Sequence, residues 1–476
     1  MPEQIDYAGQ FQYELAEIIT SNGNKIPIID NIMKMTIYED MYRGWITGEC
    51  LIHNQGAMST VGPIIGQEYF RLKIKTPTMP NKPEETINYS ENVLHIVSMN
   101  KLHIGTGTES IRFKFVSGEI IRNERLRVSQ KLEGSCSSIV DQMLDKLGCS
   151  LDRLIESSAG NKKILAPNCT PFQVINMMKR QAITSHASAP NYMFWESFRG
   201  INFRSLDSIY NQPTSWDYHT APSGSSTIGG LRNIMFDLGT IETYSMNFND
   251  SLMDNHTGLF GSKLLVHDIT KKSYSTHTYN YFDNFESEAK LDKGFPVYSD
   301  SRVNESGSRI SDFPGKVMLA PNATLPFGDR AGKDSQHYTK NGLAVFDPYS
   351  PEKWLPRRTS QMEQIERCLS LDLTVPGNTV VSVGNLIGVS LPHNAVVKEV
   401  SPPKSDKFFR GSFLVKAIRH EFITDSVLRH TMHISAIKDS LDEELLSSDE
   451  AYEPSPDKNG RRITDFYNTG PEDYYL

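Results

Sequence analysis

The chain has 476 residues, with 49 Lys and Arg against 57 Asp and Glu, and its formal net charge is −8. At about 100–200 residues per domain, this length predicts about three domains. Hydrophobic residues make up 38% of the chain and charged residues 22%, a composition that builds packed cores and excludes global disorder. The mild acidic excess argues against a protein that wraps DNA or reads its grooves, because such proteins need a basic surface.

The negative charge is concentrated in residues 439–476, which carry 11 acidic and 3 basic side chains, so the remainder of the chain is neutral. With Pro454 and Pro456 among these charges, we expect this tail not to fold alone. A purely solvating tail would not need aromatic side chains, so we predict that it docks on a neighbouring subunit or partner. The residues predicted to bind the partner are Tyr452, Phe466, Tyr467, Tyr474 and Tyr475.

No stretch of about 18 apolar residues is present, so we expect no membrane span or anchor. The five cysteines are widely spaced and form no Cys-x-x-Cys motif, which favours free, packed thiols in a reducing compartment over disulfides or a zinc site. They are Cys50, Cys136, Cys149, Cys169 and Cys368.

After a polar arm at residues 1–24, residues 25–130 show the period-2 alternation of β-strands. Phe70, Leu72 and Ile74 alternate with basic residues, and the stretch from Ile111 to Phe115 repeats the pattern. Clusters of Gly and Pro separate these short runs. The pattern predicts a first antiparallel β-barrel or sandwich.

Residues 131–230 change to a mixed α+β pattern. One helix is predicted between a Ser135 cap and Gly148, and a second begins with a capping box at Thr170. An aromatic β-hairpin follows from Tyr192 to Leu206. The Gly- and Ser-rich stretch from Pro222 to Gly230 is predicted to be a linker.

Residues 231–438 resume the β pattern as a second barrel, interrupted by an irregular insertion at about 286–360. A short helix at 361–368 precedes the strongest predicted strands of the chain, and Gly384 marks a bend between two of them. These strands are 369–375, 380–383, 385–389, 413–420 and 432–437.

None of the candidate chemical sites has a convincing pattern. His420-Glu421 begins like His-Glu-x-x-His, but position 424 is Thr and the stretch is predicted to be a strand, not the required helix. His430 and His433 are three apart, so on a strand they point to opposite faces and cannot chelate one ion. The stretch 105–110, Gly-Thr-Gly-Thr-Glu-Ser, lacks the ending of a phosphate-binding loop and is predicted to be a hairpin turn.

The other candidates also have simpler structural interpretations. The adjacent carboxylates Glu39/Asp40 and Asp442–Glu444 do not face each other across a substrate, and Cys136 has no identifiable histidine partner. The aromatics of the hairpin could stack bases, but no basic groove accompanies them, so we interpret them as its core. These are Phe194, Trp195, Phe198 and Phe203. We therefore predict no catalytic, cofactor-binding or metal-binding residues.

The order of motifs from Pro171 to Leu206 resembles the central baseplate hub proteins of T-even-like contractile phage tails. The shared features are a helix starting Pro171-Phe172, the aromatics before Glu196, Gly200, and the run Phe203 to Ser208. The tract from Thr374 to Val389 is similar to the second barrel of that family, and the stretches 31–44 and 126–147 are similar to its first barrel and the helix that leaves it. The resemblance covers about 80% of the chain and excludes 286–360 and the tail.

The resemblance implies a β-rich α+β fold in which two antiparallel β-barrel domains flank a small α+β domain. Three copies would form a trimeric ring with pseudo-sixfold symmetry, a structural adaptor between the sixfold tail tube and the threefold central spike. The implied partners are the spike, tube or tube-initiator proteins and baseplate wedge proteins. DNA would pass through the lumen without specific binding, in a virion assembled in the host cytoplasm.

Two other functions stay open at this stage. One is a hub-associated cell-wall hydrolase, for which the insertion offers His337, Asp334 and Asp347 without a supporting acid/base spacing. The other is the hub part of a related contractile secretion apparatus. We expect the lumen of the hub to be neutral to acidic, because each phosphate neutralised by Lys or Arg would add affinity for passing DNA.

Overall fold

The computed structural model describes most of the chain. The described residues are 4–54, 64–79, 82, 85–104, 108–185, 189–220, 227–228, 231–232, 234–248, 250–269, 272–292, 294–300, 308–322, 339–340, 343–344, 349–391, 409–425 and 427–442. The tail aromatics and the insertion residues His337, Asp334 and Asp347 therefore lie outside the described residues. Among the described helices, none is long and apolar enough to cross a membrane.

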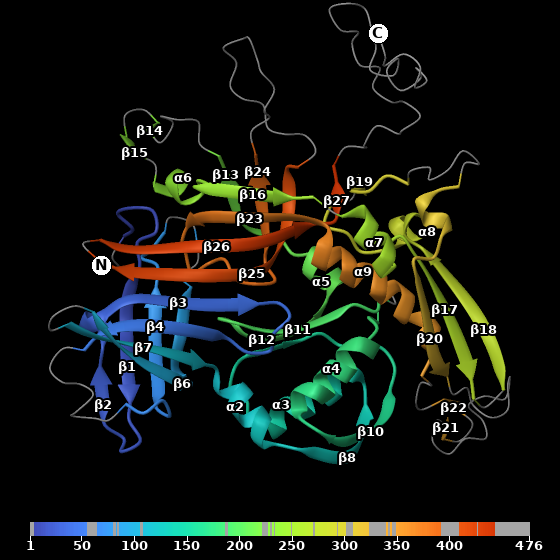
Figure 1. Cartoon of the computed structure of the whole chain (residues 1–476), viewed down its shortest axis with the longest axis horizontal. Helices are drawn as coiled ribbons and strands as arrows, with labels where there is room; N and C mark the ends of the chain where they lie inside the picture. Colours follow the sequence, from blue (N-terminus) through green and yellow to red (C-terminus); the bar gives the residue numbers. More distant parts are fainter. Residues whose placement is uncertain are drawn as a thin grey trace, which may run out of the picture.

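A 13-stranded sheet runs through both β-rich parts of the chain (Figure 1). Its main path is β16-β23-β26-β25-β3-β4-β7-β6-β5-β1-β2, and β24 and β13 branch from β25. The first β block supplies β1 (Gln12–Ile19), β2 (Lys25–Pro27), β3 (Ile32–Asp40), β4 (Thr47–His53), β5 (Tyr69–Lys75), β6 (Thr86–Ile104) and β7 (Thr108–Val116). The β pattern predicted for residues 25–130 is present, although the sheet begins earlier, at Gln12 in the expected arm.

The second β block supplies the other strands of this sheet. They are β13 (Thr214–His219), β16 (Thr243–Asn247), β23 (Leu369–Pro376), β24 (Leu386–Ser390), β25 (Gly411–Thr424) and β26 (Leu428–Lys438). The pairing is antiparallel except between β13 and β24, which run parallel. The two blocks are joined where β3 pairs with β25 over seven residue pairs, from Ala417↔Asp40 to Ile423↔Lys34.

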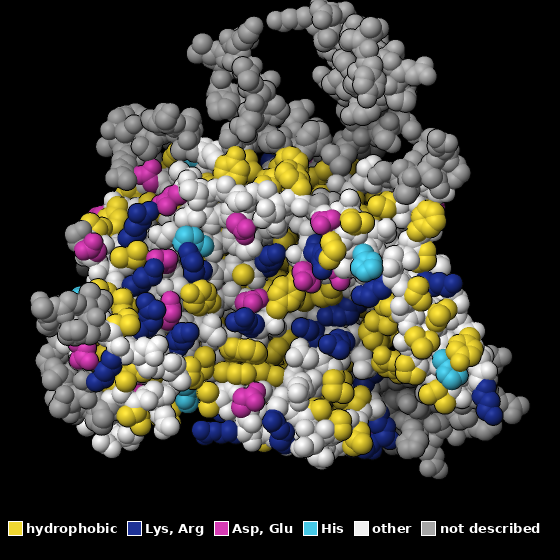
Figure 2. All heavy atoms as spheres, viewed as in Figure 1, with side chains coloured by type: hydrophobic (Ala, Val, Ile, Leu, Met, Phe, Trp, Pro, Cys, Tyr) yellow, Lys and Arg dark blue, Asp and Glu magenta, His cyan; other side chains and the backbone are white. Residues whose placement is uncertain are grey.

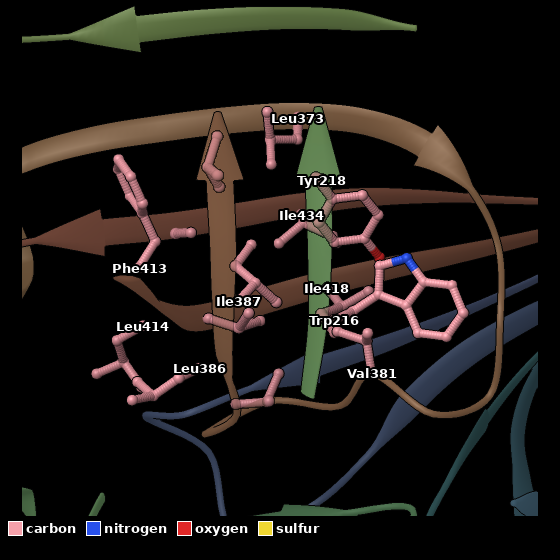
Figure 3. Close-up of a cluster of buried hydrophobic side chains, with 14 of the residues drawn as sticks. Trp216, Tyr218, Leu373, Val381, Leu386, Ile387, Phe413, Leu414, Ile418 and Ile434 are labelled. Atoms are coloured by element: carbon pink, nitrogen blue, oxygen red, sulfur yellow. The ribbon is translucent and has the colours of Figure 1, made fainter. Parts of the chain in front are cut away.

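The core of the second block is built from residues on β13, β23, β24, β25 and β26 (Figure 3), and Met246 of β16 packs against it. Trp216 and Tyr218 of β13 pack with Ile387 of β24 and with Phe413 and Ile418 of β25. The core of the first block is separate and contains Phe70, Phe113 and Phe115, whose rings contact one another. Alternating strand residues supply both cores, as period-2 patterning requires.

The α+β part lies against the first block and has its own core. Its elements are α2 (Gly118–Arg125), β8 (Val128–Gly134), α3 (Cys136–Lys146), β9 (Arg153–Ile155), β10 (Lys162–Cys169), α4 (Pro171–Gln181), β11 (Tyr192–Ser197), β12 (Gly200–Ser205) and α5 (Leu206–Tyr210). The predicted caps are confirmed: Ser135 Oγ accepts from Ser138 N, and Thr170 and Gln173 form a capping box. Strands β11 and β12 form the predicted hairpin, and β9 adds to it in parallel.

A smaller three-stranded sheet, β18-β17-β20, extends from the second block beside helix α9 (Leu355–Arg367). Its strands are β17 (Gly261–Asp268), β18 (Ser273–Asn280) and β20 (Lys316–Asn322). The remaining short elements are η1 (Ile29–Asn31), β14 (Thr227–Ile228), β15 (Leu231–Arg232), α6 (Ile234–Leu238), α7 (Ser251–Thr257), α8 (Tyr281–Asn284), η2 (Phe285–Ser287), β19 (Phe295–Pro296), η3 (Ile310–Asp312), β21 (Thr339–Lys340), β22 (Leu343–Ala344), η5 (Pro351–Lys353) and β27 (Ser440–Leu441).

Two local predictions differ from the structure. The helix expected at 361–368 is present but begins six residues earlier, at Leu355, where Pro356 occupies the first turn that tolerates it. Residues 380–383 form no strand, because the side chain of Asn378 accepts from the backbone N–H groups of Val380 and Val381 and folds the chain into a loop. Hydrogen bonds to a side chain thus take the place of the backbone hydrogen bonds between strands that the apolar residues 380–383 had predicted.

This loop connects the second block to the hairpin of the α+β part. Trp195 Nε1 donates to the Val383 carbonyl at 3.2 Å, and Gly384 adopts φ +83 beside the indole. A Cβ at Gly384 would lie 2.4 Å from Trp195 Cζ2. Glycine is therefore required here both by backbone conformation and by the close approach of the indole.

We predict that Gly384→Ala destabilises the protein more than Gly23→Ala does. Both glycines have a left-handed φ, +83 and +82, so both variants carry a backbone cost of about 1–2 kcal/mol. No atom lies within 4 Å of the Cβ position at Gly23, whereas Gly384 faces Trp195, which adds about 1–3 kcal/mol of overpacking. Denaturant midpoints of the two variants measure the difference, and equal shifts would contradict the packing argument.

Candidate functional site

The junction between β3 and β25 contains a fully buried polar network. Glu39 on β3 is 1% exposed, and His420 on β25 and His430 on β26 are 0% exposed. His420 Nε2 lies 3.1 Å from Glu39 Oε1, and His420 Nδ1 lies 3.1 Å from His430 Nε2. Ser382 Oγ donates to Glu39 Oε2 at 2.5 Å. The network therefore ties the first block, the second block and the loop that follows β23 together.

The two histidines extend the network in a line from Glu39. His420 Nε2 faces the Glu39 carboxyl group and His420 Nδ1 faces His430 Nε2, and the direction of each bond depends on the tautomers of the two rings. At the end of this line, Nδ1 of His430 is a buried atom with no hydrogen-bond partner among the described residues. Burial and the neighbouring His420 hold the pKa of His430 well below its ordinary value, which keeps this ring neutral.

Aromatic rings enclose the network on the core side. The rings of Phe422 and His430 stack with centroids 4.1 Å apart, and Phe198 of the hairpin turn lies 4.9 Å from the His420 ring. A substrate cannot reach groups that are this completely buried, so the constellation is suited to holding strands together and not to catalysis. Sequence reasoning noted Glu39 and both histidines but did not bring them together, because 381 positions separate Glu39 from His420.

A second buried carboxyl joins the α+β part to the first block. Glu196 accepts from Ser117 Oγ at 2.6 Å and from the Tyr89 hydroxyl at 3.3 Å. Burial, reinforced by the charge of Glu119, raises the pKa of Glu196 to about 8. The Glu that follows the aromatics of the hub-like motif is thus a buried structural anchor.

The opposite side of the β3–β25 junction is the exposed face of the large sheet. Strand residues that alternate with the core residues point outward here, on β23, β26, β25, β3, β4 and β7. His433 lies on this face and His430 on the other, as the strand interpretation predicted. Two adjoining open pockets on the face share Arg419, His433 and Ser435.

Charges of both signs alternate on this exposed sheet face. The basic residues are Lys34, Arg112, Lys114, Arg419 and Arg429, and the acidic residues are Asp40, Glu49, Glu242, Asp372 and Glu421. Lys34 pairs with Glu421, and Arg429 Nη2 lies 2.7 Å from Glu242 Oε1. Figure 2 shows basic and acidic side chains interspersed over this region, without an uninterrupted basic band. The described part of the face is therefore near neutral.

The remaining sequence candidates are the hairpin aromatics, the cysteines and the stretch 105–110. Phe194, Trp195 and Phe203 are buried in the hairpin core, as predicted, so they do not present their rings to bases. The five cysteines form no disulfide with one another, and Cys136 is packed in the α+β core. Residues 105–107 lie outside the described residues, but β6 and β7 on either side pair antiparallel. In the described ranges, no group of three or more His, Cys, Asp or Glu side chains is arranged to hold a metal.

Comparison with solved structures finds tail proteins that resemble this chain in fold. No family model matches the chain. A tail protein from Neisseria meningitidis has a similar fold, with a TM-score of 0.50 at 10% identity over 90% of this chain and 96% of its own. A tail protein of a Shewanella oneidensis prophage gives a TM-score of 0.48 at 8% identity over 89% of this chain and 98% of its own.

The sequence comparison is more specific. The chain is 21% identical over 344 residues to a probable baseplate hub protein of Vibrio phage KVP40, covering 69% of this chain and 73% of that protein. The chain is therefore a distant homologue of a probable phage baseplate hub protein over 69% of its length. The resemblance inferred from the hairpin motifs and the β-rich α+β fold class are confirmed.

We predict that acid destabilises the protein through His430. Its folded pKa is depressed, so protons favour the unfolded chain, and stability present above about pH 6.5 is lost as the pH falls. One such group changes the free energy of unfolding by about 1.4 kcal/mol per pH unit. His430→Phe should reduce the slope measured by denaturation between pH 7 and pH 5, whereas His256→Gln at an exposed helix end should not. An unchanged slope in His430→Phe would contradict this assignment.

Proposed function

We propose that this protein is the structural hub of a phage tail baseplate, a homotrimer that joins the sixfold tail tube to the threefold central spike. The observation that carries the proposal is homology to a baseplate hub protein in a chain whose two β blocks share one continuous sheet. Its partners would be the spike, tube or tube-initiator proteins and wedge proteins, in a virion assembled in the host cytoplasm.

The two β blocks support the proposed pseudo-sixfold ring. Each block has its own core, and the β3–β25 pairing places them side by side in one sheet. Three copies with two such units each would present six similar units to a sixfold tube. We propose the units as barrel-like domains at 25–130 and 231–438, to which β1 (Gln12–Ile19) and β13 (Thr214–His219) are added respectively because they belong to the same sheet. An α+β domain at 131–230, an insertion at about 286–360 and a tail from 439 complete the proposed division.

We further propose that the exposed sheet face lines the channel for DNA. Its support is the charge balance: a conduit must let a phosphate backbone pass, and a basic lining would bind it in a salt-dependent way. The protein would then act as a non-enzymatic adaptor. In the described residues, the buried Glu39 network gives no accessible acid/base pair that would favour a cell-wall hydrolase.

We predict that the purified protein forms a particle of about three times 53.7 kDa. Mass photometry over a range of protein concentrations measures this directly. A stable monomer at every concentration, both alone and with the spike protein, would contradict the trimeric hub.

We predict that making the sheet face basic creates DNA affinity. The wild-type trimer should bind double-stranded DNA weakly, whereas Glu49→Lys combined with Glu421→Lys should bind it with an affinity that falls as salt rises. The pair Asp283→Lys and Glu286→Lys adds the same charge at exposed positions of α8 and η2, outside the large sheet, and serves as the control. Fluorescence anisotropy at several salt concentrations compares them, and equal affinity for both double variants would exclude the proposed lining.

A further inference from the structure

The small β18-β17-β20 sheet has one covered face and one open face. On the covered face, Leu264, Val266 and Ala320 pack with Leu355 at the start of α9. The register places the alternate residues of all three strands on the other face. This open face consists of Lys263, Leu265, His267, Tyr274, Thr276, Thr278, Val317, Leu319 and Pro321.

Large apolar side chains on the open face are exposed. Val317 is 63% exposed, Leu319 71% and Tyr274 73%, and the ring of Tyr274 stacks on that of His267 at 4.5 Å. Figure 2 shows hydrophobic side chains gathered where Figure 1 places β17, β18 and β20. A contiguous apolar surface of this kind is characteristic of an interaction site.

The charge and the edges of the open face limit what can bind there. Its strand positions carry Lys263 and His267 and no carboxylate, and Lys272 lies in the turn between β17 and β18. In the described part of the chain, β18 and β20 are the outer strands of this sheet. An extended, acidic peptide with aromatic side chains would therefore match the face in charge and apolarity, and could pair with a free strand edge.

Residues 443–476 of this chain have that chemistry. They contain Glu and Asp in excess over Lys and Arg, together with Tyr452, Phe466, Tyr467, Tyr474 and Tyr475. We propose that this segment of one copy docks on the open face of a neighbouring copy. The proposal rests on the homo-oligomer of the proposed function.

One consideration favours a neighbouring copy over the same chain. In a closed ring, each copy has one tail and one open face. If each tail docks on the next copy, the open face of every copy is covered. Because the ring holds neighbouring tails close, modest contacts suffice for high occupancy.

A photo-cross-linking experiment on the full-length chain tests this. A benzophenone amino acid at position 319 is activated in particles mixed from light and heavy isotope-labelled copies, and mass spectrometry identifies the cross-linked peptides. We expect peptides from 443–476 joined between differently labelled copies. The control places the benzophenone at Leu165, which is 69% exposed on β10 and should give no such product.

Two further measurements make the outcome unambiguous. Lys263→Glu and high salt should each lower the yield several-fold, because both weaken the attraction to an acidic peptide. Cross-links to the tail within one copy, or none to the tail, would overturn the docking proposal. Mass photometry of the same sample shows whether the trimer has formed. A trimer without cross-links between the tail and a neighbouring copy would contradict the docking proposal but not the trimer.

Discussion

The pairing of β3 with β25 is the contact on which the rest of the structure depends. It joins strands from the two ends of the chain and turns two β blocks into one sheet. Beneath it, Glu39 and His420 meet in a completely buried site. A buried carboxylate is costly unless its hydrogen bonds are satisfied, so the network stabilises this register and opposes slipped alternatives in which Glu39 would lose its partners.

The same junction separates two chemical environments. A shift of one residue would exchange the faces of β3 and bring Lys34 and Tyr38 into the core, so the polar network and the apolar pattern favour the same register. On the core side the groups are buried, neutral or paired. On the outer side, basic and acidic residues alternate and several form ion pairs. Surface pairs of this kind add little stability, but they leave a large strand surface without net charge.

The α+β part braces this arrangement through two contacts. Trp195 donates to the loop after β23, and Glu196 is held by Ser117 and Tyr89 of the first block. Adjacent residues of one hairpin strand therefore connect both β blocks. These contacts give a physical reason for an aromatic residue followed by Glu at this point in the hairpin. The sequence showed this pair of residues but not that they connect the two blocks.

Local patterns in the sequence determined much of the fold. Alternation predicted β5, β7, β23 and β26, and the caps at Ser135 and Thr170 predicted α3 and α4, because these signals depend on neighbours within a few residues. The loop at 377–385 was not predicted because two Asn side chains, Asn378 and Asn385, accept the hydrogen bonds that a neighbouring strand would have accepted.

Tertiary structure alone decided that the two blocks share a sheet, that Glu39 meets His420 and His430, and that Val317 and Leu319 lie on an open face. Those outcomes depend on contacts between residues distant in the chain, which local periodicity does not encode.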